Sequence, residues 1–384
     1  MQEVFFMLGF CTLFSWIYEA GSFKKTSITK SGVIYHKRIS DRASKVFFFA
    51  LLIVMVCFSG LRTFMNDTAT YMNNFENDIP IGLNNIRYLD WSIGSNPLFH
   101  IYMILVKTYI SKSPSTFIFL TSCFVVSSFL FFLDRYAVNF SLSCYLFITF
   151  LVYAFTMGAM KQTIATAMVI WTIPMILRHK RIEAAILILF AILIHPYVIL
   201  YFAAFFLTDG VWNRKAVLAL IATFVAGIFF SEFVVVLIDI ASSIGDEYDA
   251  GMLGGQGVNI FRLAFYLIVP IFAFLNRKSL LRTKNKFYFL CINLSIISSC
   301  FMILASFGGA NMFGRMANYF DIFHCLSIPI ILKYGRETGR YRKIITGGLC
   351  VCFLIFYYTY YAKYTYRGSC FYNHISLIEL FRSW

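Results

Sequence analysis

Long apolar segments separated by short polar loops recur along the whole chain. Most of them reach the roughly 17–25 residues that a helix needs to cross the hydrocarbon core of a bilayer. Their apolar positions are continuous rather than alternating, and backbone groups in lipid must be paired internally, which predicts helices rather than barrel strands. We expect twelve candidate segments, at about residues 4–20, 46–62, 97–111, 115–133, 138–156, 160–177, 183–207, 216–241, 259–275, 287–306, 319–332 and 345–361.

No long polar block and no internal repeat divides these segments. The sequence therefore predicts one integral membrane domain, residues 1–384, of the all-α polytopic class, with about 11–12 hydrophobic helices of which one or two are broken or re-entrant. Composition agrees, because 60% of the residues are hydrophobic and 13% are charged, against about a quarter charged in soluble domains. This deficit of charge excludes a soluble enzyme, a secreted disulfide scaffold and a disordered protein.

The chain carries 33 basic and 18 acidic side chains, a net charge of +15 that would suggest nucleic acid as the partner of a soluble protein. Many of the basic residues cluster in loops at about 21–45, 277–286 and 333–343, which the positive-inside rule makes cytoplasmic. The loops at about 63–96 and 242–257 are mainly acidic, so we expect them outside, together with both chain termini. The excess charge marks the cytoplasmic face and requires no nucleic acid.

The middle of the chain allows two topologies. If the basic residues 178–181 and 214–215 are both cytoplasmic, the apolar run 183–207 must enter and leave the membrane on one side. His195 lies at the centre of this run and is followed by a proline, which removes a helix hydrogen bond and kinks the chain. We favour a broken or re-entrant hairpin with His195 near its apex, and an interfacial or half-spanning segment at 97–111. The alternative is twelve full crossings with residues 178–181 outside.

The most informative polar stretch follows the second predicted helix on its outer side. Arg62 lies at the boundary, and Asp67 and Tyr71 are four residues apart, so they share one face if this stretch is helical. A carboxylate near an arginine at a membrane surface has a reason to stay ionised and oriented. The structural alternative is that Arg62 anchors the helix at the headgroups and that Asp67 caps a short helix.

A lysine and a glutamine, Lys161 and Gln162, open an otherwise apolar helix of small residues. Ionisable groups at the mouth of a spanning helix are costly in lipid, so they face a cavity or a partner. The small residues around them also permit close helix packing, which is the structural alternative.

Two more polar positions stand out in apolar surroundings. His195 lies beside a helix break, where exposed backbone needs a polar cavity, although a buried histidine can also serve as a structural hydrogen-bonding residue. Arg315 follows the glycines 308–309 on the predicted outer side. Its guanidinium can fork onto phosphate oxygens, or it can anchor the helix at the interface beside Tyr319.

The chain has no phosphate-binding GxxxxGK[ST] loop and no GxSxG elbow, and its cysteines lie mostly in apolar runs without zinc-site spacing. We therefore expect no nucleotide cofactor and no metal. The predicted topology brings the polar positions together near the outer leaflet. Several cations with one or two bases suit an anionic, lipid-borne substrate: the cations stabilise a pyrophosphate leaving group while Asp67 or His195 takes the proton of an attacking hydroxyl.

Several motifs resemble, in order, those of EpsG-like proteins, which belong with the Wzy-type bacterial polysaccharide polymerases. The matching stretches are Ser59-Gly60-Leu61-Arg62-Thr63 with Asn66-Asp67-Thr68-Ala69-Thr70-Tyr71, Met160-Lys161-Gln162-Thr163-Ile164-Ala165, His195, and Arg315-Met316-Ala317-Asn318-Tyr319-Phe320. The family more often has arginine at the position of Lys161, so this chain offers a point charge instead of a bidentate fork there.

The resemblance implies a multi-pass protein of the bacterial cytoplasmic membrane with its active site on the outer side. It implies glycosyl transfer of a growing chain onto a new oligosaccharide repeat unit, both carried on undecaprenyl pyrophosphate, within a many-helix architecture like that of GT-C-type lipid-dependent glycosyltransferases. A chain-length regulator and other polysaccharide-assembly proteins are the expected partners besides the bilayer. The implied roles are pyrophosphate binding for Arg62, Lys161 and Arg315, catalysis for Asp67 or His195, and sugar positioning for Asn66, Tyr71, Gln162, Asn318 and Tyr319.

Two other functions stay open on the sequence alone. A flippase for the same lipid-linked unit would also contain broken helices and buried charges. The absence of an inverted repeat and the clustering of the candidate residues on one side speak against it. A membrane O-acyltransferase would also use a buried histidine.

Overall fold

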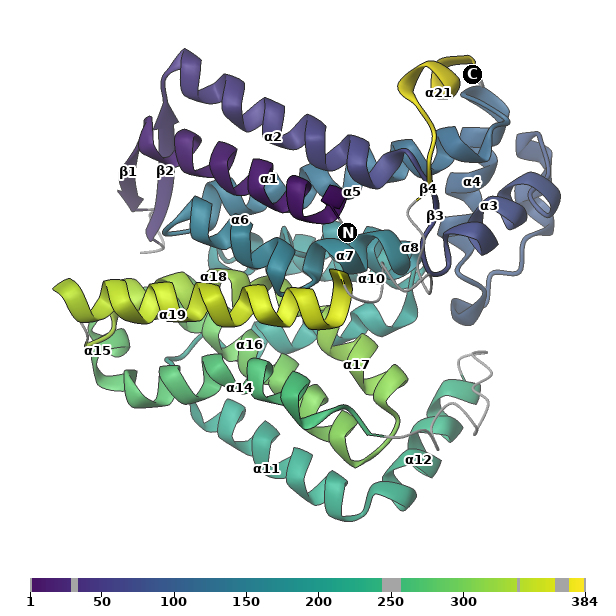
Figure 1. Cartoon of the computed structure of the whole chain (residues 1–384). Helices are drawn as coiled ribbons and strands as arrows, with labels where there is room; N and C mark the ends of the chain where they lie inside the picture. The colour runs from purple at the N-terminus through teal and green to yellow at the C-terminus, as the bar shows by residue number, and fades with distance from the viewer. Residues whose placement is uncertain (1, 29–33, 244–256, 337–338, 363–372, 383–384) are drawn as a thin grey trace.

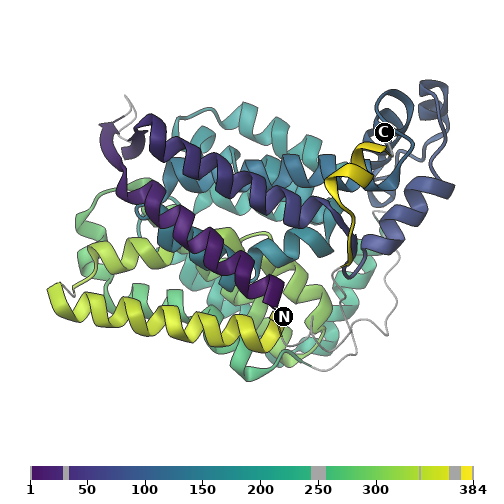
Figure 2. The ribbon, with the colours of Figure 1, turned by 45° about the horizontal axis from the view of Figure 1, so that its top comes forward.

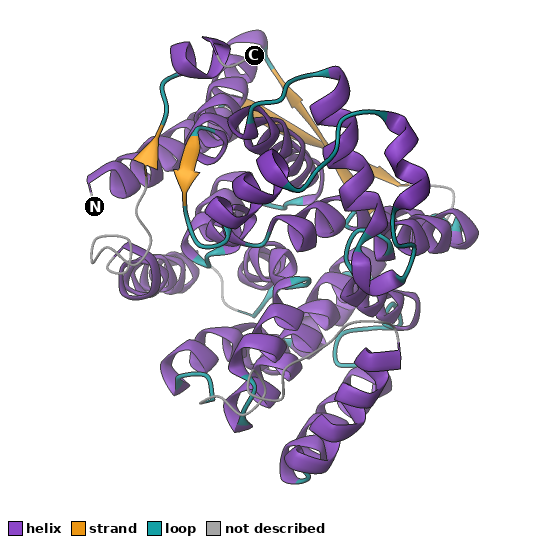
Figure 3. Ribbon diagram, turned by 90° about the vertical axis from the view of Figure 1, so that its right-hand side faces the viewer, coloured by secondary structure: helices purple, strands orange, loops and turns teal. Residues whose placement is uncertain are grey.

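The computed structural model describes residues 2–28, 34–243, 257–336, 339–362 and 373–382, and they form a helical bundle with very little strand (Figures 1 and 3). The first half contains α1 (Gln2–Ala20), β1 (Ser22–Ile28), β2 (Ile34–Ser40), α2 (Arg42–Gly60), β3 (Arg62–Phe64), α3 (Thr68–Asn77), η1 (Leu83–Tyr88), η2 (Ile93–Ser95), α4 (Pro97–Tyr109), α5 (Pro114–Tyr136), α6 (Phe140–Thr149), α7 (Val152–Gly158), α8 (Met160–Val169), α9 (Thr172–Leu177) and α10 (Arg181–Ile192). The second half contains η3 (Pro196–Phe206), α11 (Arg214–Ile228), α12 (Phe230–Ser243), α14 (Ile260–Leu275), α15 (Arg277–Arg282), α16 (Lys286–Phe307), α17 (Ala310–Asn318), α18 (Asp321–Tyr334), α19 (Gly339–Tyr357), η4 (Tyr358–Ala362), β4 (Asn373–His374) and α21 (Leu377–Arg382).

The predicted class of polytopic helical membrane protein is confirmed. Within the described ranges, six helical segments are long and apolar enough to span a bilayer, and two bent helix pairs raise this number to eight. The six are α1, α2, α5, α8 with α9, α16, and α19 with η4. The predicted external loop at 242–257 lies almost entirely outside the described residues, as do parts of the predicted cytoplasmic loops at 21–45 and 333–343.

Helix α16 forms the centre of the bundle. In its spanning window 89% of the residues are buried, against 22% for α19 and 33% for α1, which lie at the periphery (Figure 1). Small polar side chains allow close contacts around α16: the hydroxyls of Ser295 and Ser327 are 3.0 Å apart, and Ser299 donates to the carbonyl of Tyr266 at 2.7 Å. The apolar side chains of the peripheral helices are exposed in the bundle, as expected for surfaces that face lipid.

Two apolar runs that look continuous in the sequence are bent. Helices α6 and α7 meet at 50°, where Leu151 adopts a left-handed backbone conformation with φ of 67°. Helices α11 and α12 meet at 104°, directly after Gly227. A Cβ atom on Gly227 would lie 2.6 Å from the ring of Phe307, so the glycine permits α11 and α16 to approach there.

The segment around His195 is a broken hairpin. The span from Met160 to Leu177 begins beside Lys161 and ends at the opposite side of the bundle, where α10 starts. Helix α10 returns and stops at Ile192, and η3 begins at Pro196 and runs back. The hairpin then leaves toward α15, because the Nε of Arg277 donates to the carbonyl of Val211 at 3.0 Å.

This geometry agrees with the first of the two predicted topologies. Helix α4 has 13 residues, so it is about 20 Å long and too short to cross a hydrocarbon core of about 30 Å. Its amide at Leu98 donates to the carbonyl of Leu193 at 3.1 Å, which joins α4 to the turn of the hairpin. The assignment of each end to a side of the membrane stays a prediction.

A polar layer covers one end of the bundle. It consists of α3, η1, η2 and α4, and lies at the right of Figure 1, whereas the β1–β2 hairpin and α15 lie at the left. The C-terminal strand β4 returns to this layer and pairs antiparallel with β3 (Figure 2). The amide of Ile375 extends this pairing by donating to the carbonyl of Leu61 at 3.0 Å.

Candidate active site

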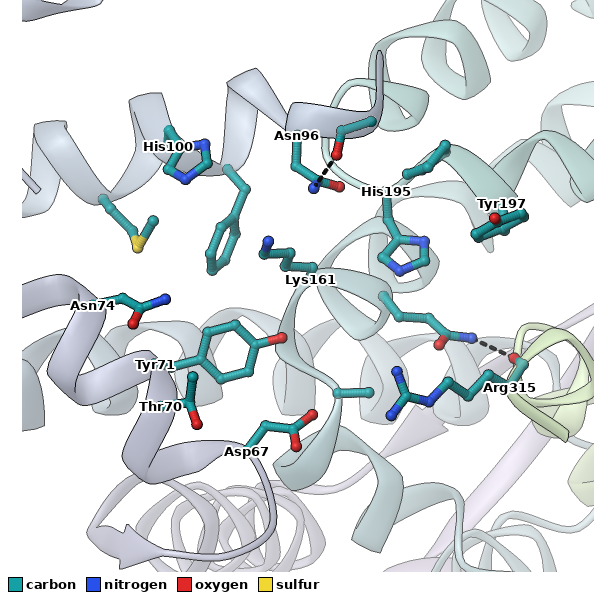
Figure 4. Close-up of a pocket in the computed structure, with 16 residues that line it drawn as sticks. Asp67, Thr70, Tyr71, Asn74, Asn96, His100, Lys161, His195, Tyr197 and Arg315 are labelled. Atoms are coloured by element: carbon teal, nitrogen blue, oxygen red, sulfur yellow. Dashed lines mark hydrogen bonds between the residues drawn. The ribbon is translucent and has the colours of Figure 1, made fainter. Parts of the chain in front are cut away.

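Segments far apart in the sequence meet in one cavity of about 360 Å³ beneath the polar layer (Figure 4). Its lining comes from α3, the start of α4, the start of α8, the turn of the α10–η3 hairpin, and α17. The candidate residues that line it are Asp67, Tyr71, Lys161, Gln162, His195 and Arg315. The structure therefore brings together six of the ten residues singled out in the sequence.

Asp67 occupies the N-cap position of α3 without capping it. Its side chain accepts no hydrogen bond from the first turn of α3, and it points into the cavity (Figure 4). The preceding residue, Asn66, has φ of 47°, a left-handed conformation that asparagine tolerates and that turns the chain from β3 into α3. The sequence alternative, in which Asp67 is only a helix cap, does not describe this geometry.

Tyr71 lies one turn after Asp67 on the same face of α3, as its spacing predicts. Burial in the cavity wall, with a contribution from the charge of Asp67, raises the pKa of Tyr71 to about 12. The phenol is therefore protonated at neutral pH and can donate a hydrogen bond to a ligand. Its hydroxyl points toward Lys161 in Figure 4.

Lys161 enters the cavity from the start of α8, immediately after the break between α7 and α8 at Ala159. Its Nζ lies 5.4 Å from the centre of the Phe99 ring, within the range of a cation–π contact. The side-chain amide of the next residue, Gln162, donates through Nε2 to the backbone carbonyl of Arg315 and so ties α8 to α17. One helix start therefore supplies both a cation and the link that positions a second cation.

His195 lines the cavity from the turn between α10 and η3, where its backbone is extended. Its Nδ1 is hydrogen-bonded to the hydroxyl of Tyr319, which is buried at the end of α17. Tyr319 itself does not line the cavity but accepts at its carbonyl a hydrogen bond of 2.8 Å from Tyr201 of η3. This pair of contacts fixes the orientation of the imidazole.

Arg315 projects into the cavity from α17, whose start is allowed by Gly309 at φ of +57°. Its guanidinium faces the side of the cavity that holds Asp67 (Figure 4). Within the described part of the chain, neither of these two side chains takes part in an ion pair. Among the described residues, the lining of the cavity thus holds two basic side chains, Lys161 and Arg315, against one carboxylate, and it suits a ligand with negative charge.

Arg62 does not line this cavity. It is buried at 1% exposure, with hydrogen bonds from Nε to Thr68 Oγ1 at 3.0 Å, from one terminal nitrogen to the carbonyl of Ser59 and to Ser122 Oγ, and from the other to the carbonyl of Met157 at 2.9 Å. These partners come from the end of α2, from α3, α5 and α7. In this structure Arg62 connects α2, α3, α5 and α7 beside the cavity and does not line it.

Asn66 and Asn318 also lie outside the first cavity. Both line a second cavity of about 330 Å³. Residues that are close in the chain line the two cavities, because Asn66 precedes Asp67 and Asn318 is one turn beyond Arg315. The predicted sugar-positioning residues are thus divided: Tyr71 and Gln162 line the first cavity, Asn66 and Asn318 line the second, and Tyr319 lines neither.

Sequence reasoning missed several polar residues of the first cavity, namely Asn74, Asn96, His100 and Tyr197. Asn74 continues the face of α3 that carries Asp67 and Tyr71, so its spacing was a usable signal. Asn96 and His100 reach the site only because α4 packs at the turn of the hairpin, which no local pattern indicates. Across the described ranges, no three His, Cys, Asp or Glu side chains are grouped so that they could hold a metal ion.

The comparisons with known proteins agree with the motifs. A model of the EpsG family matches residues 45–376, which include every candidate residue of the first cavity and extend to strand β4. No curated protein and no solved structure matches the chain significantly. The resemblance found in the motifs is therefore confirmed at the level of the family.

Proposed function

The chain belongs to the EpsG family, and from this premise we propose that it is a glycosyltransferase that polymerises polysaccharide repeat units at the outer face of a bacterial cytoplasmic membrane. The observation that carries the proposal is the cavity in which Asp67, Lys161, His195 and Arg315 converge from four separate segments. Two cations, a carboxylate and an oriented histidine are what transfer from a lipid pyrophosphate requires.

The proposed substrates are two oligosaccharides, each linked to undecaprenyl pyrophosphate. A hydroxyl of the incoming unit attacks the anomeric carbon of the growing chain, a new glycosidic bond forms, and the bond from that carbon to the pyrophosphate oxygen breaks. The leaving pyrophosphate takes the electron pair, and Lys161 and Arg315 stabilise its added negative charge. Arg315 is suited to a bidentate contact, whereas Lys161 acts as a point charge.

We assign the proton of the attacking hydroxyl to Asp67. Its carboxylate is not used as a helix cap and faces the two cations across the cavity, so it can take the proton of the hydroxyl of the incoming repeat unit. His195 is the alternative base of the sequence analysis, but its Nδ1 is already bonded to Tyr319. When Tyr319 donates, the proton of the neutral ring is on Nε2, and His195 then serves as a hydrogen-bond donor to the substrate.

The remaining candidates take supporting roles in this proposal. Tyr71 donates from its neutral phenol to a sugar or phosphate oxygen, and Gln162 and Tyr319 position Arg315 and His195 through the hydrogen bonds described above. Arg62 was expected to bind pyrophosphate. Because its guanidinium is consumed by contacts to four other segments, we propose a positioning role for it instead.

A test in cells separates this function from its rivals. Deleting the gene of a polymerase leaves surface lipid that carries single repeat units, whereas deleting a flippase leaves none and deleting an O-acyltransferase leaves full-length chains without acyl groups. We expect single units, restoration of long chains by the wild-type gene, and no restoration by Asp67→Asn at equal protein level.

The matched control for that test is Asp78→Asn, which removes an exposed carboxylate just after α3. It should restore long chains. Full restoration by Asp67→Asn would refute the assigned base, and full-length chains after deletion of the gene would refute the proposed function.

A further inference from the structure

The second cavity is built from chain neighbours of the catalytic residues. Asn66 adjoins Asp67, Gly158 adjoins Ala159, and Asn318 follows Arg315 by one turn of α17. The second cavity is lined by Asn66, Gly158 and Asn318, and the first cavity by their neighbours Asp67, Ala159 and Arg315. A ligand that occupies both cavities would therefore pass the carboxylate of Asp67.

Aromatic rings form much of the wall of this second cavity. Four of them line it: Phe150 from the bend between α6 and α7, and Tyr266, Phe356 and Tyr360 from α14, α19 and η4. The rings of Phe150 and Tyr266 have centroids 4.8 Å apart, and Phe356 and Tyr360 have centroids at the same separation. The wall thus offers flat apolar surfaces that are held in place by one another.

Polar groups of both kinds face the same space. Asp321 is buried and accepts hydrogen bonds of 2.8 Å from Tyr266 Oη and from Ser298 Oγ. The Nε of Arg262 is buried and, among the residues that the structure describes, has no hydrogen-bond partner. Asn66 and Asn318 add amides that can donate and accept.

The position of Asn66 depends on a close approach. A Cβ atom on Gly158 would lie 3.0 Å from the side-chain nitrogen of Asn66, so a larger residue there would shift this amide by a few tenths of an ångström. Asn66 and Gly158 therefore pack closely where residues of the two cavities adjoin in the chain.

We infer that the second cavity binds a sugar ring of the lipid-linked glycan. This inference rests on the proposed function and assigns a binding site to the sugar part of the proposed substrate. The apolar face of a sugar ring packs on aromatic surfaces, and its hydroxyls require donors and acceptors together, which Arg262, Asp321 and the two asparagines provide.

Other ligands fit this wall less well. A polyprenyl chain would leave the buried Nε of Arg262 without a partner, which costs free energy. A pyrophosphate would meet the carboxylate of Asp321 beside Arg262, the one basic side chain among the described residues of the lining. At about 330 Å³ the cavity is within the size range of about 300–1,000 Å³ that small-molecule sites have.

The test compares two lipids on the full-length protein in nanodiscs. One is the lipid-linked repeat unit extracted from cells that lack this gene, and the other is undecaprenyl pyrophosphate without sugar. All variants are made in an Asp67→Asn background to prevent turnover. Arg262→Gln and Asn318→Ala should weaken binding of the glycan-bearing lipid by about tenfold, equivalent to about 1.4 kcal/mol, and leave binding of the sugar-free lipid unchanged.

The control is Arg282→Gln, which removes an exposed arginine from α15 at the opposite end of the bundle and should change neither affinity. If Arg262→Gln lowers the melting temperature, Asn318→Ala, at a half-buried position, decides the result. Unchanged affinity for both lipids in Asn318→Ala would overturn the inference, and so would equal weakening for both.

Failure of the inference and failure of the proposed function give different results. If the wild-type protein elongates glycans and the second-cavity variants bind the glycan-bearing lipid normally, only the inferred sugar site is refuted. If the wild-type protein binds the glycan-bearing lipid through this cavity but elongates no glycan, the proposed polymerase function is refuted and the inferred sugar site stands.

Discussion

The guanidinium of Arg62 joins segments that meet beside the candidate active site. It donates to backbone carbonyls of Ser59 and Met157 and to the hydroxyls of Thr68 and Ser122, all from a buried position. Thr68 begins the helix that carries Asp67, and Met157 lies just before the break that leads to Lys161. A single side chain thereby sets the spacing between the proposed base and a proposed pyrophosphate ligand.

Replacing Arg62 by methionine should destabilise the protein more than it alters substrate affinity. The change removes the hydrogen bonds of the guanidinium to two buried carbonyls and two buried hydroxyls, at about 0.5–1.5 kcal/mol each, so we expect a loss of at least about 2 kcal/mol and a lower melting temperature in detergent. Arg62→Lys should rescue little, because an ammonium group cannot serve partners on both sides. An unchanged melting temperature with a strongly raised KM would instead return Arg62 to the role of a pyrophosphate ligand.

Several residues of the candidate active site could be predicted from single positions in the sequence. Asp67, Lys161, His195 and Arg315 are polar or charged residues beside long apolar runs, where lipid makes an idle charge costly, and the structure groups them. The same logic gave Arg62 the wrong surroundings. An arginine that satisfies buried carbonyls and an arginine that awaits an anion look alike until their neighbours in space are known.

At the scale of elements, the polar layer is held by a lysine that caps a helix from a distance. Lys107 of α4 is buried, and its Nζ donates to the carbonyls of Phe75, Glu76 and Ile79 at 2.8, 2.8 and 2.7 Å. The first two carbonyls belong to the last turn of helix α3 and the third follows its end, where the dipole favours a cation. The face of α3 that carries Asp67 is therefore fixed relative to α4.

Replacing Lys107 by methionine should loosen α3 and reduce activity although Lys107 is outside the cavity. Loss of all three donors should cost about 2–4 kcal/mol locally, so amide hydrogen exchange in residues 68–77 should accelerate. The comparison is Lys112→Met, which removes an exposed lysine shortly after α4. Equal protection of α3 in both variants would show that Lys107 does not hold the layer.

Helices and breaks could be predicted where the local sequence determines them, but not where they depend on contacts with distant segments. The twelve apolar runs all contain helices, and the break at His195 follows from the proline after it. The bend of 104° after Gly227 and the pairing of β3 with β4 could not be read from the sequence. Both depend on partners far along the chain, Phe307 in one case and residues 373–374 in the other.

For the whole molecule, the paths of the helices connect charge pattern and geometry. The Met160–Leu177 span leads away from the cavity to residues 178–181, and α10 leads back to His195. The basic residues 178–181 and the loop before α11 thus lie away from the cavity, as the broken hairpin requires. The positive-inside rule then predicts that this end is cytoplasmic and that the cavity is external.

Reporter fusions test this orientation. A reporter that works only in the cytoplasm should be active when fused at Arg135 or at Lys180. A reporter that works only outside the membrane should be active when fused at Lys112, because α5 crosses between Lys112 and Arg135. An external Lys180 would contradict the broken hairpin and would require twelve full crossings.

Glycan length after reaction of the purified protein with lipid-linked repeat units tests the central claim most directly. The full chain, reconstituted in liposomes without nucleotide or added metal, should convert single units into a ladder of longer lipid-linked glycans and release undecaprenyl pyrophosphate. Asp67→Asn should yield none of these products, and Asp78→Asn should yield the wild-type ladder. Glycans that stay at one unit with the folded wild-type protein would contradict the account.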